Sequence, residues 1–349
     1  MKLSMRVGAA LRWIVVALGL PLAALGDSPP SAAAPAASEI ETMSRALQKA
    51  HAAVVGVRAR AVDDARSAST LGRERQGSGI LIGADGLVLT IGYLILEAEH
   101  VELLLDGERV VPARVVAYDV ATGFGLVQSL APLRLEPVTL GDAARLAPDE
   151  LLMIASGGDD GDVSMAKIVS RRAFSGYWEY HIDSALFTSP PRTDHSGAAL
   201  INGRGEVVGI GSLLVTDALG PGQPRLPGNM FVPVDLLKPV LAEMRNNGSS
   251  RPSRRAWIGL NCVEQEGEVR VIRVNDDSPA DVAGLQPGDR IVRIDGSEVG
   301  ALEAFYKALW SGGAPEREVT LEVRRGGESQ TLKVQSVDRM KTLRRANGI

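Results

Sequence analysis

The sequence has little of several things, and each shortage excludes a class of protein. Its 349 residues include one cysteine and four histidines. Cys262 therefore has no partner for an intrachain disulfide, and its place in an apolar segment predicts a buried, unreactive thiol. The histidines are scattered and show no metal-ligand spacing, so neither a metal nor a cofactor is expected.

Basic charge and long apolar runs are also scarce. The formal net charge is −4, and it becomes −7 without residues 1–26, which carry three basic and no acidic side chains. A nucleic-acid partner is therefore not expected, because such a partner requires a basic excess. After residue 26 no apolar run has the roughly 20 residues of a membrane-spanning helix.

Residues 1–26 have the pattern of a secretory signal. An apolar run, Trp13–Leu25, follows three basic side chains and ends in small residues where a signal peptidase would cut. The alternative is an uncleaved anchor, which the shortness of the run disfavours. Residues 27–39 are rich in alanine, proline and serine and predict a flexible spacer. We expect a periplasmic or otherwise extracytoplasmic protein.

The body of the chain alternates short apolar segments with glycine, proline and aspartate, which predicts an all-β protein. Helices are expected over 41–51 and over Val234–Arg245, with Asp235 as the N-cap of the second. The polar segment 246–253 is the expected domain boundary. The expected strands are Val54–Arg58, Gly79–Ile82, Leu87–Thr90, Val101–Leu105, Val110–Tyr118, Gly125–Ser129, Leu151–Ala155, Lys167–Ser170, Val207–Leu214 and Met230–Val232.

Residues 193–200 (TDHSGAAL) have the form of a serine-protease nucleophile loop centred on Ser196. A serine hydroxyl is a weak nucleophile until a positioned base takes its proton and a third group orients that base. The catalytic potential of the chain therefore depends on which residue could act as that base.

The order of motifs resembles the HtrA/DegP family of extracytoplasmic, trypsin-like serine proteases with a C-terminal PDZ domain. Besides the Ser196 loop, the matching motifs are Gly77–Gly79, the turn 84–86 and the hairpin 202–206. The resemblance covers roughly residues 40–338. It implies an all-β-dominated fold, in which a trypsin-like double β-barrel is followed by a small α+β PDZ domain.

The domain boundaries follow from this resemblance. The protease-like domain is expected over 40–245 and the PDZ domain over 254–338, with a basic tail over 339–349. The family commonly forms trimers, which implies a homo-trimer or a hetero-oligomer with active relatives. The sequence itself shows no signal for either.

The chain departs from the family at each position that carries the chemistry. Tyr93 stands where the family has its catalytic histidine, and Gly123 stands where it has aspartate. A tyrosine titrates near pH ~10 and is a poor proton acceptor at neutral pH. Asp194 replaces a glycine of the oxyanion loop and places negative charge where negative charge must develop. These departures indicate that Ser196 is a vestigial nucleophile, or else an ordinary turn serine.

Four other side chains are weaker candidates for the base. His195 is adjacent to Ser196, and neighbouring side chains generally diverge. His100 and His181 lie at or near strands, where a packing or surface role is the simpler interpretation. Lys167 could form a Ser-Lys dyad, but it stands in a strand that the family uses structurally.

The C-terminal module carries the second candidate site. Trp257, Ile258, Gly259 and Leu260 match the loop with which PDZ domains hold a peptide carboxylate by backbone N–H groups. In this mode an extended peptide adds to a sheet edge, and a pocket selects its last side chain. Leu302 and Phe305 recur at helical spacing and are expected to border the groove. An apolar terminus is therefore the expected ligand.

These patterns favour an exported HtrA-like pseudoprotease that binds protein C-termini or unfolded polypeptides without cleaving them. One alternative is an active HtrA-like serine endopeptidase of envelope protein quality control, in which Ser196 uses a non-standard base. Another alternative is a structural or regulatory subunit of an active relative.

Overall fold

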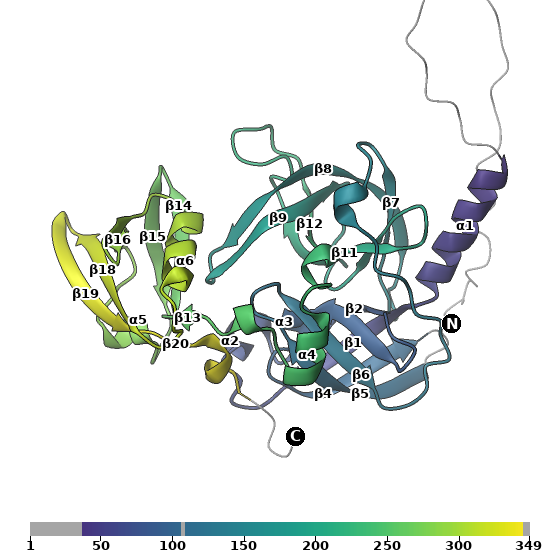
Figure 1. Cartoon of the computed structure of the whole chain (residues 1–349), viewed down its shortest axis with the longest axis horizontal. Coiled ribbons are helices and arrows are strands. Elements are labelled where there is room, and N and C mark those ends of the chain that lie inside the picture. The colour runs from purple at the N-terminus through teal and green to yellow at the C-terminus, as the bar shows by residue number, and fades with distance from the viewer. Residues whose placement is uncertain (1–36, 106–108, 345–349) are drawn as a thin grey trace, which may run out of the picture. The chain divides into compact units, whose positions relative to one another are not determined.

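A computed structural model describes residues 37–105 and 109–344 (Figure 1). The expected signal segment, most of the expected spacer and the end of the expected basic tail lie outside these residues. The helix predicted over 41–51 is present as α1, Ala37–His51. It begins within the segment that the composition assigns to the spacer. No helix in the described ranges is long and apolar enough to cross a membrane.

The first β-barrel closes in the order β1-β2-β3-β6-β5-β4. Short helices α2 (Ala68–Leu71) and α3 (Gly92–Ile95) interrupt it. Strand β3 is buried at all five positions, because one face fills the barrel while the strand also contacts β11 of the second barrel. The strands are β1 (Val54–Ala61), β2 (Glu74–Leu81), β3 (Leu87–Ile91), β4 (Ala98–Leu105), β5 (Arg109–Tyr118) and β6 (Phe124–Ser129).

The second barrel closes in the order β10-β11-β12-β9-β8-β7. Its longest hairpin pairs β8 with β9, and Gly176 opposite Tyr180 is the last pair before the turn. One buried apolar cluster runs through both barrels. The strands are β7 (Leu151–Ala155), β8 (Val163–Gly176), β9 (Tyr180–Ser189), β10 (Ala199–Ile201), β11 (Val207–Val215) and β12 (Gly228–Pro233).

The C-terminal module has its own sheet and core. Strands β14-β15-β16-β18-β19 form the sheet, β17 pairs with β16, and β13 pairs with β20. A separate apolar cluster fills this module and includes Cys262, which is buried as expected. The elements are β13 (Ala256–Trp257), β14 (Leu260–Gln265), β15 (Glu268–Val274), α5 (Pro279–Val282), β16 (Arg290–Ile294), β17 (Ser297–Glu298), α6 (Leu302–Ser311), β18 (Glu318–Arg325), β19 (Glu328–Gln335) and β20 (Val337–Asp338).

The helix predicted over Val234–Arg245 is only partly correct. A 3₁₀ turn covers Val234–Leu236, and α4 (Leu241–Asn247) begins after Pro239, which cannot donate a helical N–H. Asp235 does not cap this helix. Its carboxylate accepts the N–H of Ala143, at the start of a 3₁₀ turn (Ala143–Arg145) in the connection between the barrels.

The segment between α4 and β13 is more structured than a polar linker. It contains a 3₁₀ turn, Arg251–Ser253, and a last 3₁₀ turn, Arg339–Thr342, follows β20. Asp119 accepts the Ser250 N–H at 2.9 Å and the Ser253 hydroxyl at 2.5 Å. All three residues are buried. These bonds fix the connecting segment to the first barrel.

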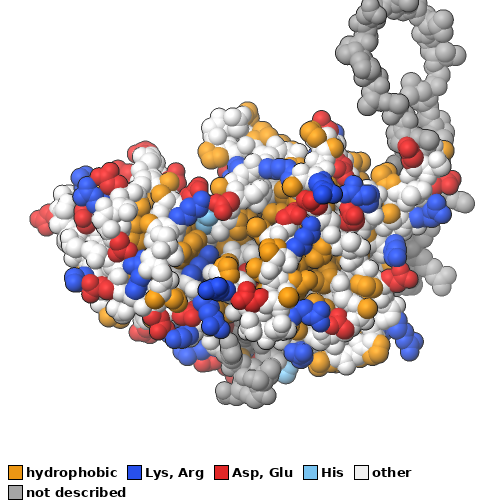
Figure 2. Space-filling model, viewed as in Figure 1, with side chains coloured by type: hydrophobic (Ala, Val, Ile, Leu, Met, Phe, Trp, Pro, Cys, Tyr) orange, Lys and Arg blue, Asp and Glu red, His pale blue; other side chains and the backbone are white. Residues whose placement is uncertain are grey.

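The fold prediction is confirmed at the level of architecture, with every expected strand present. Charged side chains of both signs are intermixed on the face seen in Figure 2. The β3–α3 junction and the β9–β10 turn bring Tyr93 and Ser196 together, and the β8–β9 turn reaches the PDZ loop.

Candidate functional site

Tyr93 and Ser196, 103 positions apart in the chain, are hydrogen-bonded partners. The Tyr93 hydroxyl oxygen lies 2.7 Å from Ser196 Oγ and 2.9 Å from the carbonyl oxygen of Ser212. Ser212 is the unpaired residue of a β-bulge in β11, where the register against β12 shifts between Gly211 and Leu213. Its carbonyl therefore takes from Tyr93 the hydrogen bond that the bulge denies it.

The direction of these bonds decides what Ser196 can do. The Tyr93 hydroxyl is the donor in both bonds, so its single phenolic proton is shared between Ser196 Oγ and the Ser212 carbonyl oxygen. Burial raises the pKa of Tyr93 to about 12. Tyr93 thus keeps its proton at neutral pH and donates it toward Ser196 Oγ, so this partner cannot deprotonate the serine.

Gly123 offers only backbone at the position where the resemblance predicts an acid. Its φ is 84°, and a Cβ built there would lie 3.1 Å from the Tyr180 hydroxyl oxygen. That hydroxyl donates to the Thr122 carbonyl at 2.7 Å. The backbone conformation and the tyrosine together disfavour a carboxylate at this place.

Asp194 carries a fixed negative charge two residues before Ser196. Its carboxylate is hydrogen-bonded to the Arg192 guanidinium and to the Ser156 hydroxyl. Burial acts to raise the pKa of Asp194, but these donors hold it below the usual value. The group is therefore ionised at neutral pH, in the loop that must stabilise an oxyanion in a working protease.

The other candidate bases are engaged elsewhere. His195 Nδ1 lies 3.2 Å from the Arg192 carbonyl oxygen, which makes that nitrogen a donor to its own loop. Burial lowers the pKa of His195. Lys167 is exposed on β8, and His100 is exposed on β4. None of the hydrogen bonds found among the described residues joins these side chains to Ser196.

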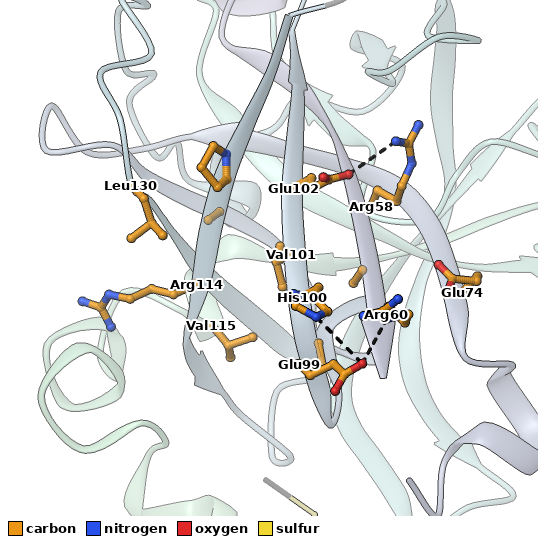
Figure 3. A pocket seen from close by; sticks show the side chains of 14 residues that line it. Arg58, Arg60, Glu74, Glu99, His100, Val101, Glu102, Arg114, Val115 and Leu130 are labelled. Atoms are coloured by element: carbon orange, nitrogen blue, oxygen red, sulfur yellow. Dashed lines mark hydrogen bonds and ion pairs between the residues drawn. The ribbon is translucent and has the colours of Figure 1, made fainter. Parts of the chain in front are cut away.

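One groove lies on the outside of the first barrel and does not include Ser196. It has a volume of about 560 Å³ and is lined by β1, β4 and β5 (Figure 3). Its charged walls pair with each other: Arg58 contacts Glu102 at 3.4 Å, and Arg60 contacts Glu99 at 3.0 Å. His100 lies 4.0 Å from Glu99. Arg58 and Arg60 are thus paired within the groove, and no serine, cysteine or lysine is among the described residues that line it.

The PDZ loop already holds a carboxylate, and this carboxylate belongs to the chain itself. Glu179 Oε1 accepts the N–H of Gly259 at 2.7 Å and that of Leu260 at 2.9 Å. Oε2 lies 3.4 Å from the N–H of Ile258. The Glu179 side chain is buried, and burial raises the pKa of its carboxyl, while the three amides and the Arg339 guanidinium act in the opposite direction.

The turn that carries Glu179 makes further bonds to the PDZ domain. The Tyr177 carbonyl accepts the N–H of Cys262 at 2.9 Å. On α6, the Tyr306 hydroxyl donates to the Gly176 carbonyl at 2.8 Å and accepts from the Glu179 N–H at 3.3 Å. The turn therefore contacts both β14 and α6, the two elements that border the predicted peptide groove.

The predicted peptide-binding residues take different places around this contact. Ile258, Gly259 and Leu260 form the loop, and the Trp257 ring lies 4.8 Å from the Arg339 guanidinium. Leu302 and Phe305 are buried in the PDZ core. Sequence reasoning did not single out Glu179 or identify Tyr306 as a contact. The available signal was a glutamate inside a three-residue hairpin turn, where glycine is the usual choice.

Arg255, at the start of the PDZ module, is buried beside the same turn. Its Nη2 donates to the carbonyls of Val120 at 3.1 Å and Glu179 at 3.3 Å. The guanidinium carbon lies 3.7 Å from the centre of the Trp310 ring. Burial lowers the pKa of Arg255 to about 10, so it stays charged at neutral pH and links the barrels to the PDZ domain.

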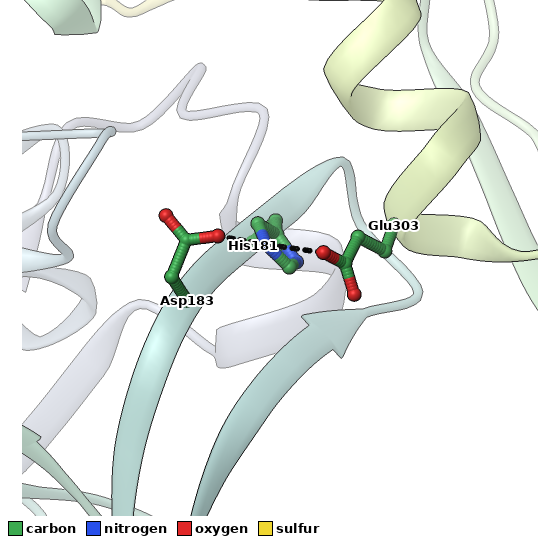
Figure 4. A group of neighbouring side chains, drawn as sticks. All are labelled: His181, Asp183 and Glu303. Carbon is green, nitrogen blue, oxygen red and sulfur yellow. Dashed lines mark hydrogen bonds and ion pairs between the residues drawn. The ribbon is translucent and has the colours of Figure 1, made fainter.

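His181, Asp183 and Glu303 gather metal-ligating atoms on β9 and α6 (Figure 4). His181 Nε2 lies 3.2 Å from Asp183 and 3.9 Å from Glu303. Lys307 Nζ already pairs with both carboxylates, at 2.6 Å from Asp183 and 2.7 Å from Glu303. The group acts as an ion-paired contact between the second barrel and α6.

Comparison with known proteins agrees with this architecture. A trypsin-like peptidase domain model matches residues 77–210, and a PDZ domain model matches residues 256–335. A probable periplasmic serine endoprotease, DegP-like, from Hahella chejuensis is 27% identical over 274 residues, which cover 74% of this chain and 56% of that protein. A protein of the same description from Ectopseudomonas mendocina is 29% identical over 285 residues, covering 75% and 57%.

The chain thus spans a little over half the length of these curated relatives. Among solved structures, the HtrA-type protease AlgW with decapeptide has a TM-score of 0.53 at 18% identity, covering 85% of this chain and 98% of that one. A serine endoprotease from Yersinia pestis has a TM-score of 0.51 at 20% identity, covering 89% and 99%. With a trypsin-like barrel pair, a nucleophile-type loop and a PDZ domain in this order, the chain belongs to the HtrA/DegP family.

Proposed function

We propose that this chain is an exported, non-proteolytic member of its family that binds protein C-termini or unfolded segments through its PDZ domain. The observation that carries the first half is the hydrogen bond that the protonated Tyr93 hydroxyl donates to Ser196 Oγ. It fixes the serine in a nucleophile-like place while withholding the base that would activate it.

Two other features support the loss of hydrolysis. Gly123 cannot orient a base, and Asp194, whose carboxylate is bound by Arg192 and Ser156, replaces a glycine of the family's oxyanion loop. Removal of a catalytic triad lowers turnover by about 10⁶, and the remaining activity depends largely on the oxyanion hole. Here a side chain at position 194 replaces the glycine of the oxyanion loop, which disfavours this remaining activity as well.

The PDZ loop supports the binding half of the proposal. Its three N–H groups converge on one carboxylate, which is the chemistry that a chain terminus would present. The solved HtrA-type protease named above is described with a decapeptide, which favours a peptide ligand for the related domain of this chain. The names of the relatives and the signal-like segment 1–26 favour a periplasmic location.

Proteolysis is tested with the purified chain and a denatured, fluorescently quenched protein substrate, beside Ser196→Ala. We expect both proteins to release fluorescence at the same background rate. Cleavage by the wild-type chain that is absent from Ser196→Ala would contradict the proposal and establish an endopeptidase with a non-standard base. Binding is tested separately, with the peptides described in the next section.

The oligomeric role stays a prediction of its own. Mixing the chain with an active relative and separating the complexes by size would reveal a mixed oligomer. A change in the protease rate of that relative upon mixing would assign a regulatory role.

A further inference from the structure

We propose that the β8–β9 turn, Gly176–Tyr180, is an internal ligand of the PDZ domain, and that a protein C-terminus binds only by displacing it. The loop offers one set of converging N–H groups, and Glu179 uses them. An external carboxylate and Glu179 therefore exclude each other. The proposal rests on the peptide-binding role given above and adds the regulation of that site.

The contacts of the turn reproduce those of an added strand. The Glu179 carboxylate accepts the N–H of Leu260, and the Tyr177 backbone carbonyl accepts the N–H of Cys262. Residues two apart on the turn therefore bind residues two apart on β14. This is the spacing at which a strand edge presents successive N–H groups to a neighbouring chain. The turn therefore imitates a short extended segment with a carboxylate at its end.

The backbone conformation of Glu179 is one that the turn could form more easily with glycine. Gly176 pairs with Tyr180, which leaves a three-residue loop, and Glu179 has a φ of 58°. Glycine adopts this left-handed conformation more readily than any residue with a side chain. The carboxylate is held at this position because it binds the PDZ amides.

Other bonds stabilise the docked turn from both sides. The Tyr306 hydroxyl bonds to the Gly176 carbonyl and to the Glu179 N–H, and Arg255 donates to the Glu179 carbonyl. Lys307 on α6 pairs with Asp183 on β9. A ligand must therefore compete with contacts that are already made. Its apparent affinity is the intrinsic affinity multiplied by the fraction of molecules whose groove is free.

The turn itself can be tested in the full-length, ligand-free chain by amide hydrogen exchange over residues 258–262. We expect Glu179→Gly to exchange at least about tenfold faster there than wild type, because the amides lose their acceptor. Glu266→Gly is the matched control: Glu266 also has a positive φ, 55°, in an exposed turn of the PDZ domain. Glu179→Gln, which keeps the side-chain shape, provides a second variant if the glycine variant does not fold.

Competition is tested by fluorescence anisotropy with a labelled peptide, Ser-Gly-Tyr-Trp-Val, which copies the turn and ends in an apolar residue. The free-carboxylate form should bind Glu179→Gly at least about tenfold more tightly than wild type or Glu266→Gly. The C-terminally amidated form should bind none of them. Trp178 in the turn, and Trp257 and Trp310 on the PDZ side, add an intrinsic signal for displacement.

The outcomes separate this inference from the proposed function. Equal affinity of wild type and Glu179→Gly for the free-carboxylate peptide would overturn competition while peptide binding stands. Unchanged exchange in both Glu179 variants would overturn the internal ligand directly. Faster exchange without peptide binding to any variant would support the internal ligand and contradict the peptide-binding function.

Discussion

Removal of the Tyr93 hydroxyl is the perturbation with the best-defined consequence. Tyr93→Phe keeps the ring but deletes the donor to the Ser212 carbonyl and to Ser196 Oγ. Ser212 is buried, and as the unpaired residue of a bulge it relies on this side chain. We therefore expect the substitution to lower the free energy of unfolding of the barrels.

The magnitude follows from the two bonds. An unsatisfied buried carbonyl costs about 1–3 kcal/mol, and the loss of an ordinary hydrogen bond costs roughly 0.5–1.5 kcal/mol. A total of about 2–3 kcal/mol in a domain of roughly 200 residues lowers the melting temperature by about 4–12 °C. Ser196→Ala removes only one acceptor of a hydroxyl that stays bonded to Ser212, so its effect should be smaller.

The assay is thermal unfolding of the full chain, followed by near-ultraviolet circular dichroism. Tyr177→Phe is the matched control, because Tyr177 is 43% exposed and its hydroxyl is not part of the Tyr93 network. A melting temperature for Tyr93→Phe within about 1 °C of wild type and of Tyr177→Phe would refute a structural role for the Tyr93 hydroxyl. Serine-dependent proteolysis that disappears in Tyr93→Phe would show instead that this hydroxyl takes part in catalysis.

Three further predictions concern the buried polar contacts of Asp119, the triad positions Tyr93 and Gly123, and the contacts of Arg255. Asp119 accepts hydrogen bonds from Ser250 and Ser253, and these and other donors hold the pKa of its carboxyl low despite burial. The ionised carboxylate therefore stabilises the folded chain above about pH 4, and this stabilisation is lost as the pH falls through the folded pKa. Asp119→Asn should therefore lower the melting temperature at pH 7, and a difference from wild type that persists unchanged at pH 3 would contradict this. The double variant Tyr93→His with Gly123→Asp should not gain protease activity, because of the positive φ at Gly123 and the nearby Tyr180 hydroxyl; Ser196-dependent cleavage of a denatured substrate would contradict this. Arg255→Lys should lower the melting temperature by a few degrees, since an ammonium cannot both stack on Trp310 and reach two carbonyls; an unchanged melting curve would show that the linkage is dispensable.

Much of the fold could be predicted because its signals are local. Apolar segments bounded by glycine, proline and aspartate gave the strands, and Cys262 is buried in the apolar segment that predicted it. The helix over Val234–Arg245 was overestimated for a physical reason. Pro239 interrupts the hydrogen-bond ladder there, and Asp235 finds a partner at Ala143, which sequence spacing does not reveal.

In the candidate site, too, local motifs could be predicted and long-range partners could not. Family motifs predicted the positions of Tyr93, Gly123 and Ser196, and the structure brings Tyr93 and Ser196 into contact. The Ser212 carbonyl could not be predicted, because it becomes a partner only through a bulge. Glu179 reaches Gly259 across 80 positions, and no local pattern links a hairpin turn to a loop that far away.

The central claim is that Ser196 is held but not activated, and a fluorophosphonate probe tests it most directly. The probe reacts with activated serines, so mass spectrometry of the peptide containing Ser196 measures activation without the choice of a protein substrate. We predict no adduct on Ser196 after incubation at pH 7–8 under conditions that label trypsin completely. An adduct on Ser196 that forms in the native chain and is abolished by heat denaturation would contradict the account.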